Sequence, residues 1–97
     1  MTNQLPMIVK FEVKKGMESL VKEELLKMVE ITLKEDGCVA YDLYQDAEDP
    51  TVFMFYEVWA TYDAWKKHDQ MPHVNVFREA TKDAILKISA NKLNRIK

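Results

Sequence analysis

Residues Cys38 to Trp59 read CVAYDLYQDAEDPTVFMFYEVW, a pattern typical of a β-hairpin. In Cys38 to Gln45, Val39, Tyr41 and Leu43 alternate with Ala40, Asp42 and Tyr44, which is the period of a half-buried strand. The cluster from Asp46 to Pro50 supplies turn residues, and Val52 to Trp59 returns as a strand rich in aromatic residues. These three segments predict two antiparallel strands joined by a short turn.

The segments before the hairpin predict a strand followed by a helix. In Met7 to Val13, apolar residues alternate with charged ones, as in a half-buried strand. From Met17 to Lys34, apolar residues recur at the spacing of a helix, and Gly37 follows as a left-handed cap. The recurring apolar positions are Met17, Leu20, Val21, Leu25, Met28 and Ile31.

The segments after the hairpin predict two helical stretches and a last strand. Thr61 can cap a short helix, and Pro72 interrupts it because proline is acceptable only at a helix start. A second helical stretch is expected from His73 to Lys87, and a weak strand within Ser89 to Ile96. The core face of the second stretch would carry His73, Phe77, Ala80 and Ala84.

The order β-α-β-β-α-β predicts an α+β, ferredoxin-like fold, with a four-stranded antiparallel sheet and its helices on one face. Seven of the eight residues from Val52 to Trp59 are apolar, so both faces of this strand need burial, whereas the helices cover only one. We therefore expect a homodimer in which a second copy covers the bare face. Residues 1–97 should form a single domain, with a flexible N-terminus over residues 1–6.

Composition and charge exclude several classes of protein. Fourteen basic against sixteen acidic residues leave no basic stripe for nucleic acid. The apolar runs are far shorter than the ~18 residues of a membrane span, and the N-terminus has no signal-peptide character, so we expect a cytoplasmic protein without a membrane partner. Cys38, the single cysteine, has no partner for a disulfide or a thiolate metal site and is expected to be a small core residue.

One carboxylate is predicted to stand among aromatic rings. Glu57 and Trp59 leave their strand on the same face as Phe53 and Phe55. An ionised carboxylate in such a place is costly, so Glu57 should have a hydrogen-bond partner or a raised pKa. A structural ion pair at the end of the strand would explain this glutamate equally well.

Two histidines lie on the predicted helices after this strand, and both can face the sheet. His68 and His73 are candidates for acid-base work, because the pKa of histidine lies near 6.5; the alternative is a structural role. A metal site formed with Glu57 is not predicted, because the spacing, interrupted by Pro72, matches no ligand motif. The role of Glu24, on the apolar face of the first helix, stays open.

A family resemblance rests on Gly37 to Asp42, Asp46 to Pro50, Phe55 to Trp59, Ala64, His68, Pro72-His73 and Phe77. With these residues the chain resembles the antibiotic biosynthesis monooxygenase family, and it is most similar to short quinol monooxygenase-like members. The resemblance implies a dimeric α+β barrel, a ligand pocket between sheet and helices, and oxidation of phenols or quinols by dioxygen without metal or flavin. Members that oxidise anthrone-type polyketides or degrade haem use an asparagine with a tryptophan, and the well-defined predicted strands contain no asparagine.

The leading hypothesis is a cofactor-independent monooxygenase that oxidises a small aromatic quinol or phenol with dioxygen. His73, favoured by its place on the helix face and at a helix N-terminus, or His68 would be the base, and Glu57 would orient a histidine or hold a hydroxyl. Tyr41 could offer a hydroxyl to a phenolic ligand. The substrate ring would stack on Trp59, Phe53 and Phe55. The alternatives are an isomerase of a small phosphorylated carbonyl compound, related to autoinducer-2 processing, and a non-catalytic small-molecule-binding or stress module.

Overall fold

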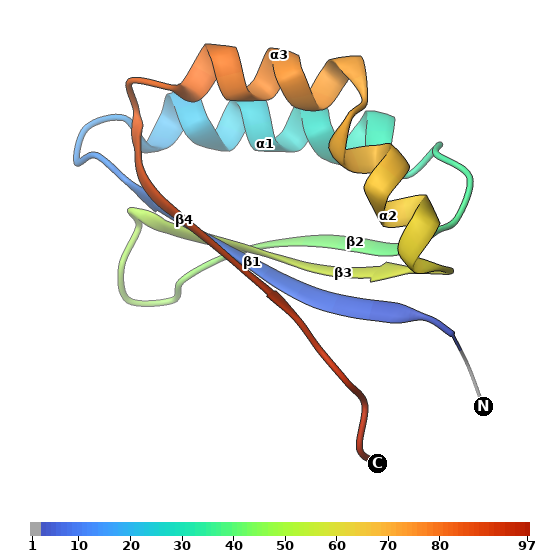
Figure 1. Cartoon of the computed structure of the whole chain (residues 1–97). Coiled ribbons are helices and arrows are strands. Elements are labelled where there is room, and N and C mark those ends of the chain that lie inside the picture. The colour runs from blue at the N-terminus through green and yellow to red at the C-terminus, as the bar shows by residue number, and fades with distance from the viewer. Residues whose placement is uncertain (1–2) are drawn as a thin grey trace.

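The computed structural model describes residues 3–97, which form a four-stranded antiparallel sheet with three helices on one face (Figure 1). In chain order the elements are β1 (Leu5–Val13), α1 (Glu18–Thr32), β2 (Cys38–Gln45), β3 (Val52–Trp59), α2 (Tyr62–Asp69), α3 (Pro72–Thr81) and β4 (Ile85–Lys92). The strand order across the sheet is β2-β3-β1-β4. The predicted ferredoxin-like α+β architecture is confirmed, with the second crossover divided into α2 and α3.

Short polar residues set several of these boundaries, as the sequence indicates. The Asp46 carboxylate accepts a hydrogen bond from the Asp49 amide (2.8 Å) in the turn between β2 and β3. The Thr61 hydroxyl accepts one from the Ala64 amide (3.1 Å) and thereby caps α2. Pro72 begins α3, where its missing N–H leaves no helical hydrogen bond unmade.

Strand β3 lies between β1 and β2, and its register decides which side chains meet under the helices. Phe53, Phe55, Glu57 and Trp59 are all buried, which confirms that they share the covered face. Glu57 pairs with Met7 on β1 and with Tyr41 on β2. Because paired residues point to the same side of a sheet, the Tyr41 ring and the Glu57 carboxyl are neighbours beneath the helices.

Helix α1 buries a narrower stripe than its apolar spacing suggests. Its buried residues are Val21, Leu25, Met28 and Thr32. Leu20 and Ile31 are exposed, because they flank this stripe on the solvent side of the helix. Position 32 therefore brings a hydroxyl, rather than an alkyl side chain, to the layer between helices and sheet.

Helix α3 ends earlier, and β4 begins earlier, than predicted. The helix stops at Thr81 instead of Lys87, because the chain turns there and Ile85 pairs with Val13 at the edge of the sheet. The buried residues of α3 are Val74, Phe77 and Thr81. Ala80, which was assigned to the core face, is exposed. The helical-wheel prediction was wrong because it continued the helix through the turn between Thr81 and Ile85, which contains neither glycine nor proline.

Strand β1 begins within the segment expected to be flexible. Leu5 pairs with Trp59 and Pro6 pairs with Val58. The Pro6 carbonyl also accepts a hydrogen bond from the Leu93 amide (2.8 Å). Residues 5 and 6 therefore belong to β1 and not to a flexible segment, because β3 holds both of them and the Leu93 amide holds Pro6. Residues 1 and 2 lie outside the described residues.

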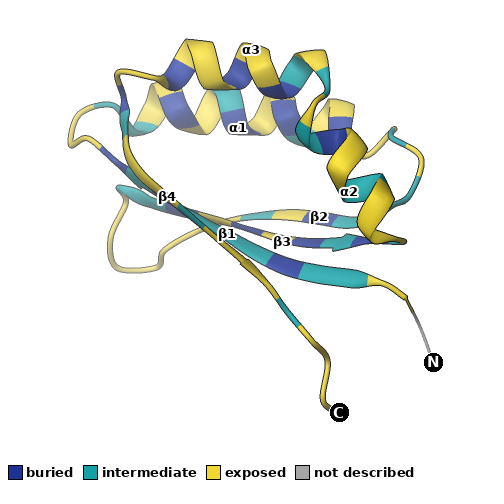
Figure 2. Ribbon diagram, in the orientation of Figure 1, coloured by how far each residue is buried: buried dark blue, intermediate teal, exposed yellow. Residues whose placement is uncertain are grey.

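The face of the sheet turned away from the helices is uncovered in this chain (Figures 1 and 2). Met54 and Tyr56 on β3 are 37% and 39% exposed, and Tyr44 on β2 is exposed beside them. The predicted bare face is therefore present. None of the helices in residues 3–97 has the length and apolar character needed to cross a lipid bilayer.

Candidate functional site

A cavity of about 190 Å³ lies between the helix-covered face of the sheet and helices α2 and α3. Its polar wall consists of Tyr41, Glu57, His68, Asp69 and Arg78. The rest is mainly apolar, with Met7, Val9 and Phe55 from the sheet. Half-exposed Asp69 and Arg78 form an ion pair of 2.7 Å at the solvent side. A mainly apolar pocket with a few polar groups and a charged rim is typical of a site for a small, largely apolar ligand.

The structure brings most of the predicted site residues together but divides them into two groups. Tyr41, Phe55, Glu57 and His68 line the cavity. Phe53, Trp59 and His73 are not part of its wall. Trp59 is fully buried behind the site, where its ring packs against His68 with the centroids 4.6 Å apart. Trp59 thus supports the wall and does not offer a ring surface to the cavity.

Glu57 is held by tryptophan and not by a histidine. The Trp59 indole N–H donates a hydrogen bond of 2.9 Å to Oε1 of Glu57, which two residues on one strand face can form. Burial raises the pKa of Glu57 to about 7, with this hydrogen bond opposing the shift. The prediction of a partner or a raised pKa fits on both counts. The suggestion that Glu57 orients a histidine is wrong, because another carboxylate does so.

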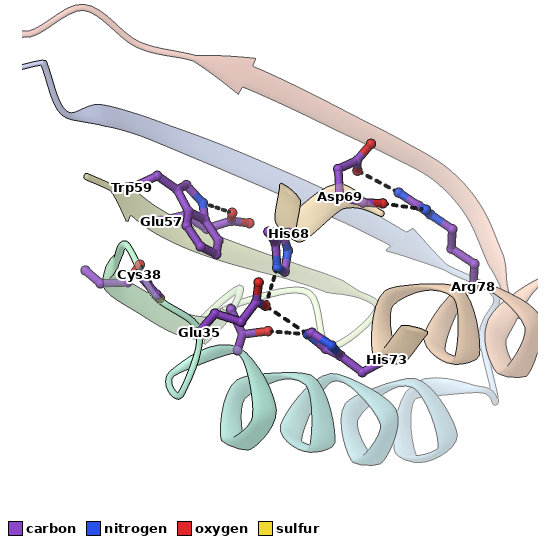
Figure 3. A network of polar contacts seen from close by, with 10 residues as sticks. Glu35, Cys38, Glu57, Trp59, His68, Asp69, His73 and Arg78 are labelled. Carbon is purple, nitrogen blue, oxygen red and sulfur yellow. Dashed lines mark hydrogen bonds and ion pairs between the residues drawn. The ribbon is translucent and has the colours of Figure 1, made fainter. Parts of the chain in front are cut away.

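That carboxylate is Glu35, in the loop between α1 and β2 (Figure 3). Its Oε2 lies 2.7 Å from Nδ1 of His68 and 3.1 Å from Nε2 of His73. A carboxylate oxygen only accepts, so Nδ1 of a neutral His68 carries the proton. Nε2 of His73 also lies 3.0 Å from the Thr32 hydroxyl, which can donate or accept. The second nitrogen of His68, Nε2, then keeps its lone pair and has no hydrogen-bond partner among residues 3–97. His68 is thereby oriented as a proton acceptor on the cavity wall.

The contact between Glu35 and His68 depends on a close approach of loop and helix. Gly37 has a left-handed φ of +86°, and a Cβ on it would lie 2.6 Å from the Cβ of Ala64 on α2. The Gly37 carbonyl also accepts a hydrogen bond of 2.7 Å from the Ala60 amide. Only glycine fits here, and this fit brings the Glu35 loop against the helix that carries His68.

Burial also sets the protonation of the groups around the cavity. Desolvation lowers the pKa of His68, and Glu35 opposes this shift only in part. Desolvation and the charge of Glu57 raise the pKa of Tyr41 far above its ordinary value, so its phenol stays protonated. The cavity therefore presents a neutral imidazole, a phenol O–H and a carboxyl group with a pKa of about 7. Such a set can accept a proton at one point and donate hydrogen bonds at others.

Two further candidates from the sequence lie outside this set. Glu24 forms a surface ion pair with Lys27 (2.9 Å) and does not reach the cavity. Cys38 is partly buried, and burial raises the pKa of its thiol to about 11. A thiol with this pKa is protonated at neutral pH and is a poor nucleophile.

Comparisons with known proteins agree with this fold. Residues 6–80, a range that contains every polar residue of the cavity wall, match the sequence model of the antibiotic biosynthesis monooxygenase family. An uncharacterised protein of Synechocystis is 32% identical over 79 residues, which cover 77% of this chain and 54% of that protein, so the chain spans about half the length of this relative.

Two solved structures share the fold over nearly their whole length. A protein of Pseudomonas aeruginosa has a TM-score of 0.94 and 26% identity, covering 100% of this chain and 98% of its own. A protein of Nitrosomonas europaea, provisionally named an antibiotic biosynthesis monooxygenase, has a TM-score of 0.92 and 24% identity, covering 99% and 93%. The family match and these structures lead to one conclusion: the chain belongs to the antibiotic biosynthesis monooxygenase family.

Proposed function

We propose that the protein is a monooxygenase that oxidises a small aromatic quinol or phenol with dioxygen, without flavin or metal. The observation that carries the proposal is the orientation of His68, whose Nδ1 is held by Glu35 while Nε2 is left as a proton acceptor at the cavity. Membership of a monooxygenase family supports the reaction class. The base proposed is thus His68, and His73 supports Glu35 from behind.

The proposed reaction balances without an external reductant when the substrate is a quinol. Nε2 of His68 takes a proton from the ring hydroxyl, and the resulting anion passes an electron to dioxygen. The two radicals join at a ring carbon, and loss of water from the adduct leaves a hydroxyquinone. One oxygen atom of dioxygen enters the ring and the other leaves as water. The quinol supplies all four electrons.

The walls of the cavity suit a single aromatic ring. Phe55 and Tyr41 offer ring contacts, and the Tyr41 hydroxyl and the Glu57 carboxyl offer hydrogen bonds to substrate oxygens. An engineered cavity of about 150 Å³ holds benzene. The volume here is about 190 Å³, which suits a substituted single ring better than a three-ring polyketide.

Oxygen uptake tests this proposal directly. With methylhydroquinone we expect one dioxygen consumed per quinol, continued turnover in the presence of a chelator, and much slower reaction of three-ring phenols. An isomerase would instead convert a phosphorylated carbonyl compound without consuming oxygen. A binding module would be stabilised by about 2.7 kcal/mol at a ligand concentration of 100 times Kd, with no turnover. Absence of uptake with every single-ring quinol would overturn the proposal.

The protein is also proposed to act as a homodimer whose two bare sheet faces pack together. Tyr56 and Met54 would lie in this interface, where their apolar surface would be removed from water. Light scattering at micromolar concentration should give the mass of two 11.4 kDa chains, and Tyr56→Asp should shift the mass toward one chain. Tyr62→Asp, at an exposed tyrosine on α2, is the matched control and should leave the dimer intact. A monomeric wild-type protein would rule out this assembly.

A further inference from the structure

The cluster of Glu35, His68 and His73 has the composition of a metal-binding site. Its three ligating atoms come from the α1–β2 loop, α2 and α3, and all lie within 4.8 Å of one another. The side chains are only 8%, 7% and 11% exposed. Both histidines of the chain belong to this cluster. Residues far apart in the sequence are thus gathered around one buried point.

Two of the three ligand–ligand distances in the cluster are close to those of a tetrahedral coordination shell, and the two histidine nitrogens lie within 4.8 Å of each other. Ligands at about 2.0–2.1 Å from tetrahedral zinc lie about 3.3 Å from one another. The contacts of Glu35 Oε2 with the two ring nitrogens measure 2.7 and 3.1 Å, so each needs to lengthen by well under 1 Å. The three residues lie in a loop and near the ends of two helices, where small shifts are better tolerated than in the middle of a helix or strand.

The ligand atoms of this cluster, two imidazole nitrogens and one carboxylate oxygen, favour one chemical class of ion. Two imidazoles with one carboxylate suit first-row transition metals such as Zn²⁺, Co²⁺ or Ni²⁺. Mg²⁺ and Ca²⁺ favour shells of oxygen ligands, which this cluster does not provide. Three protein ligands leave a fourth position for water, as in many zinc sites.

We propose that Glu35, His68 and His73 bind one divalent transition-metal ion of this class, and that the bound ion switches off His68 as a base. Metal at Nδ1 of His68 displaces the proton now shared with Glu35, and in a neutral imidazole that proton moves to Nε2. The nitrogen at the cavity then donates a hydrogen bond and no longer accepts a proton. The binding step is independent of the proposed function, whereas the switch rests on it.

Calorimetry with the full, untagged chain tests the binding step. Zn²⁺ should bind with one ion per chain, and Mg²⁺ should give no binding heat. Glu35→Gln and His73→Gln should each weaken Zn²⁺ binding at least tenfold, whereas Glu57→Gln, which alters a cavity carboxyl outside the cluster, and Cys38→Ser should not. Circular dichroism spectra of each variant and of the wild type are compared to verify folding. Independently, the absorption spectrum of Co²⁺ bound to the wild type reports whether the coordination is tetrahedral with nitrogen ligands.

The possible results of these experiments test metal binding and quinol oxidation separately. The proposal is overturned when no equimolar Zn²⁺ binding is found, or when both Glu35→Gln and His73→Gln bind as the wild type does. Zinc that binds at the cluster and stops oxygen uptake supports both site and switch. Zinc that binds there without slowing uptake overturns the switch alone. Absence of quinol turnover under any condition concerns the proposed function and leaves the binding result unaffected.

Discussion

Replacing His68 with glutamine should lower the oxygen-dependent turnover of a quinol about 100-fold, the usual contribution of a positioned general base. Glutamine can still donate a hydrogen bond to Glu35, so the buried carboxylate keeps a partner, but it cannot accept the substrate proton. The measurement is kcat/KM from initial rates of oxygen uptake, with circular dichroism and light scattering to verify folding and assembly.

The matched control for this variant is His73→Gln. His73 also contacts Glu35 but does not line the cavity, so its replacement should lower turnover less than tenfold. Equal turnover of His68→Gln and the wild type would exclude His68 as the base. A larger loss of turnover in His73→Gln than in His68→Gln would identify His73 as the base, which the sequence alone favoured.

Replacing Glu57 with glutamine should remove a pH dependence of about 3 kcal/mol from the free energy of unfolding. In the unfolded chain Glu57 loses its proton at its ordinary pKa of 4.5, whereas in the folded chain its pKa is about 7. Between these pH values the folded state retains a proton that the unfolded state has released, so the free energy of unfolding falls as pH rises. Glu57→Gln keeps the acceptor for Trp59 and has no proton to lose.

Urea unfolding at pH 5 and pH 8, at one protein concentration, measures this difference. The wild type should lose about 2.5 kcal/mol more than Glu57→Gln between the two pH values, because pH 5 already lies above the unfolded pKa of 4.5. Glu48→Gln, at an exposed position in the turn between β2 and β3, should follow the wild type. Parallel behaviour of wild type and Glu57→Gln would mean that Glu57 is not held protonated in the folded protein.

The strands and first helix follow from sequence because their signals are local. The alternation in β2 predicts the covered side of Tyr41 but not that of Val39, which is exposed next to a register shift at the start of the strand. In β3, Glu57 lies among aromatic rings because it has the same parity as Phe55 and Trp59. The end of α3 is not fixed in this way. Phe77 and Ala84 are seven residues apart, which suits a continuing helix, and only pairing of Ile85 with Val13 in the folded sheet ends it.

Glu35 could not be found from the sequence because its partners are distant along the chain. It stands between Lys34 and Asp36, in a charged run that is typical of an exposed loop. Its burial results from the packing of this loop on α2, more than thirty residues later. The one local signal is Gly37, which marks a special backbone conformation but does not identify what lies against it. The chemistry of the site thus depends on tertiary contacts that periodicity does not contain.

The stacking of His68 on Trp59 gives the molecule an optical reporter of its own. The two ring centroids lie 4.6 Å apart, a distance at which a protonated imidazole quenches the fluorescence of an indole. The second tryptophan, Trp65, packs beneath the ammonium group of Lys92 and can be replaced by phenylalanine. We then expect the emission of Trp59 alone to follow the charge on His68 in solution, without a label and without a substrate.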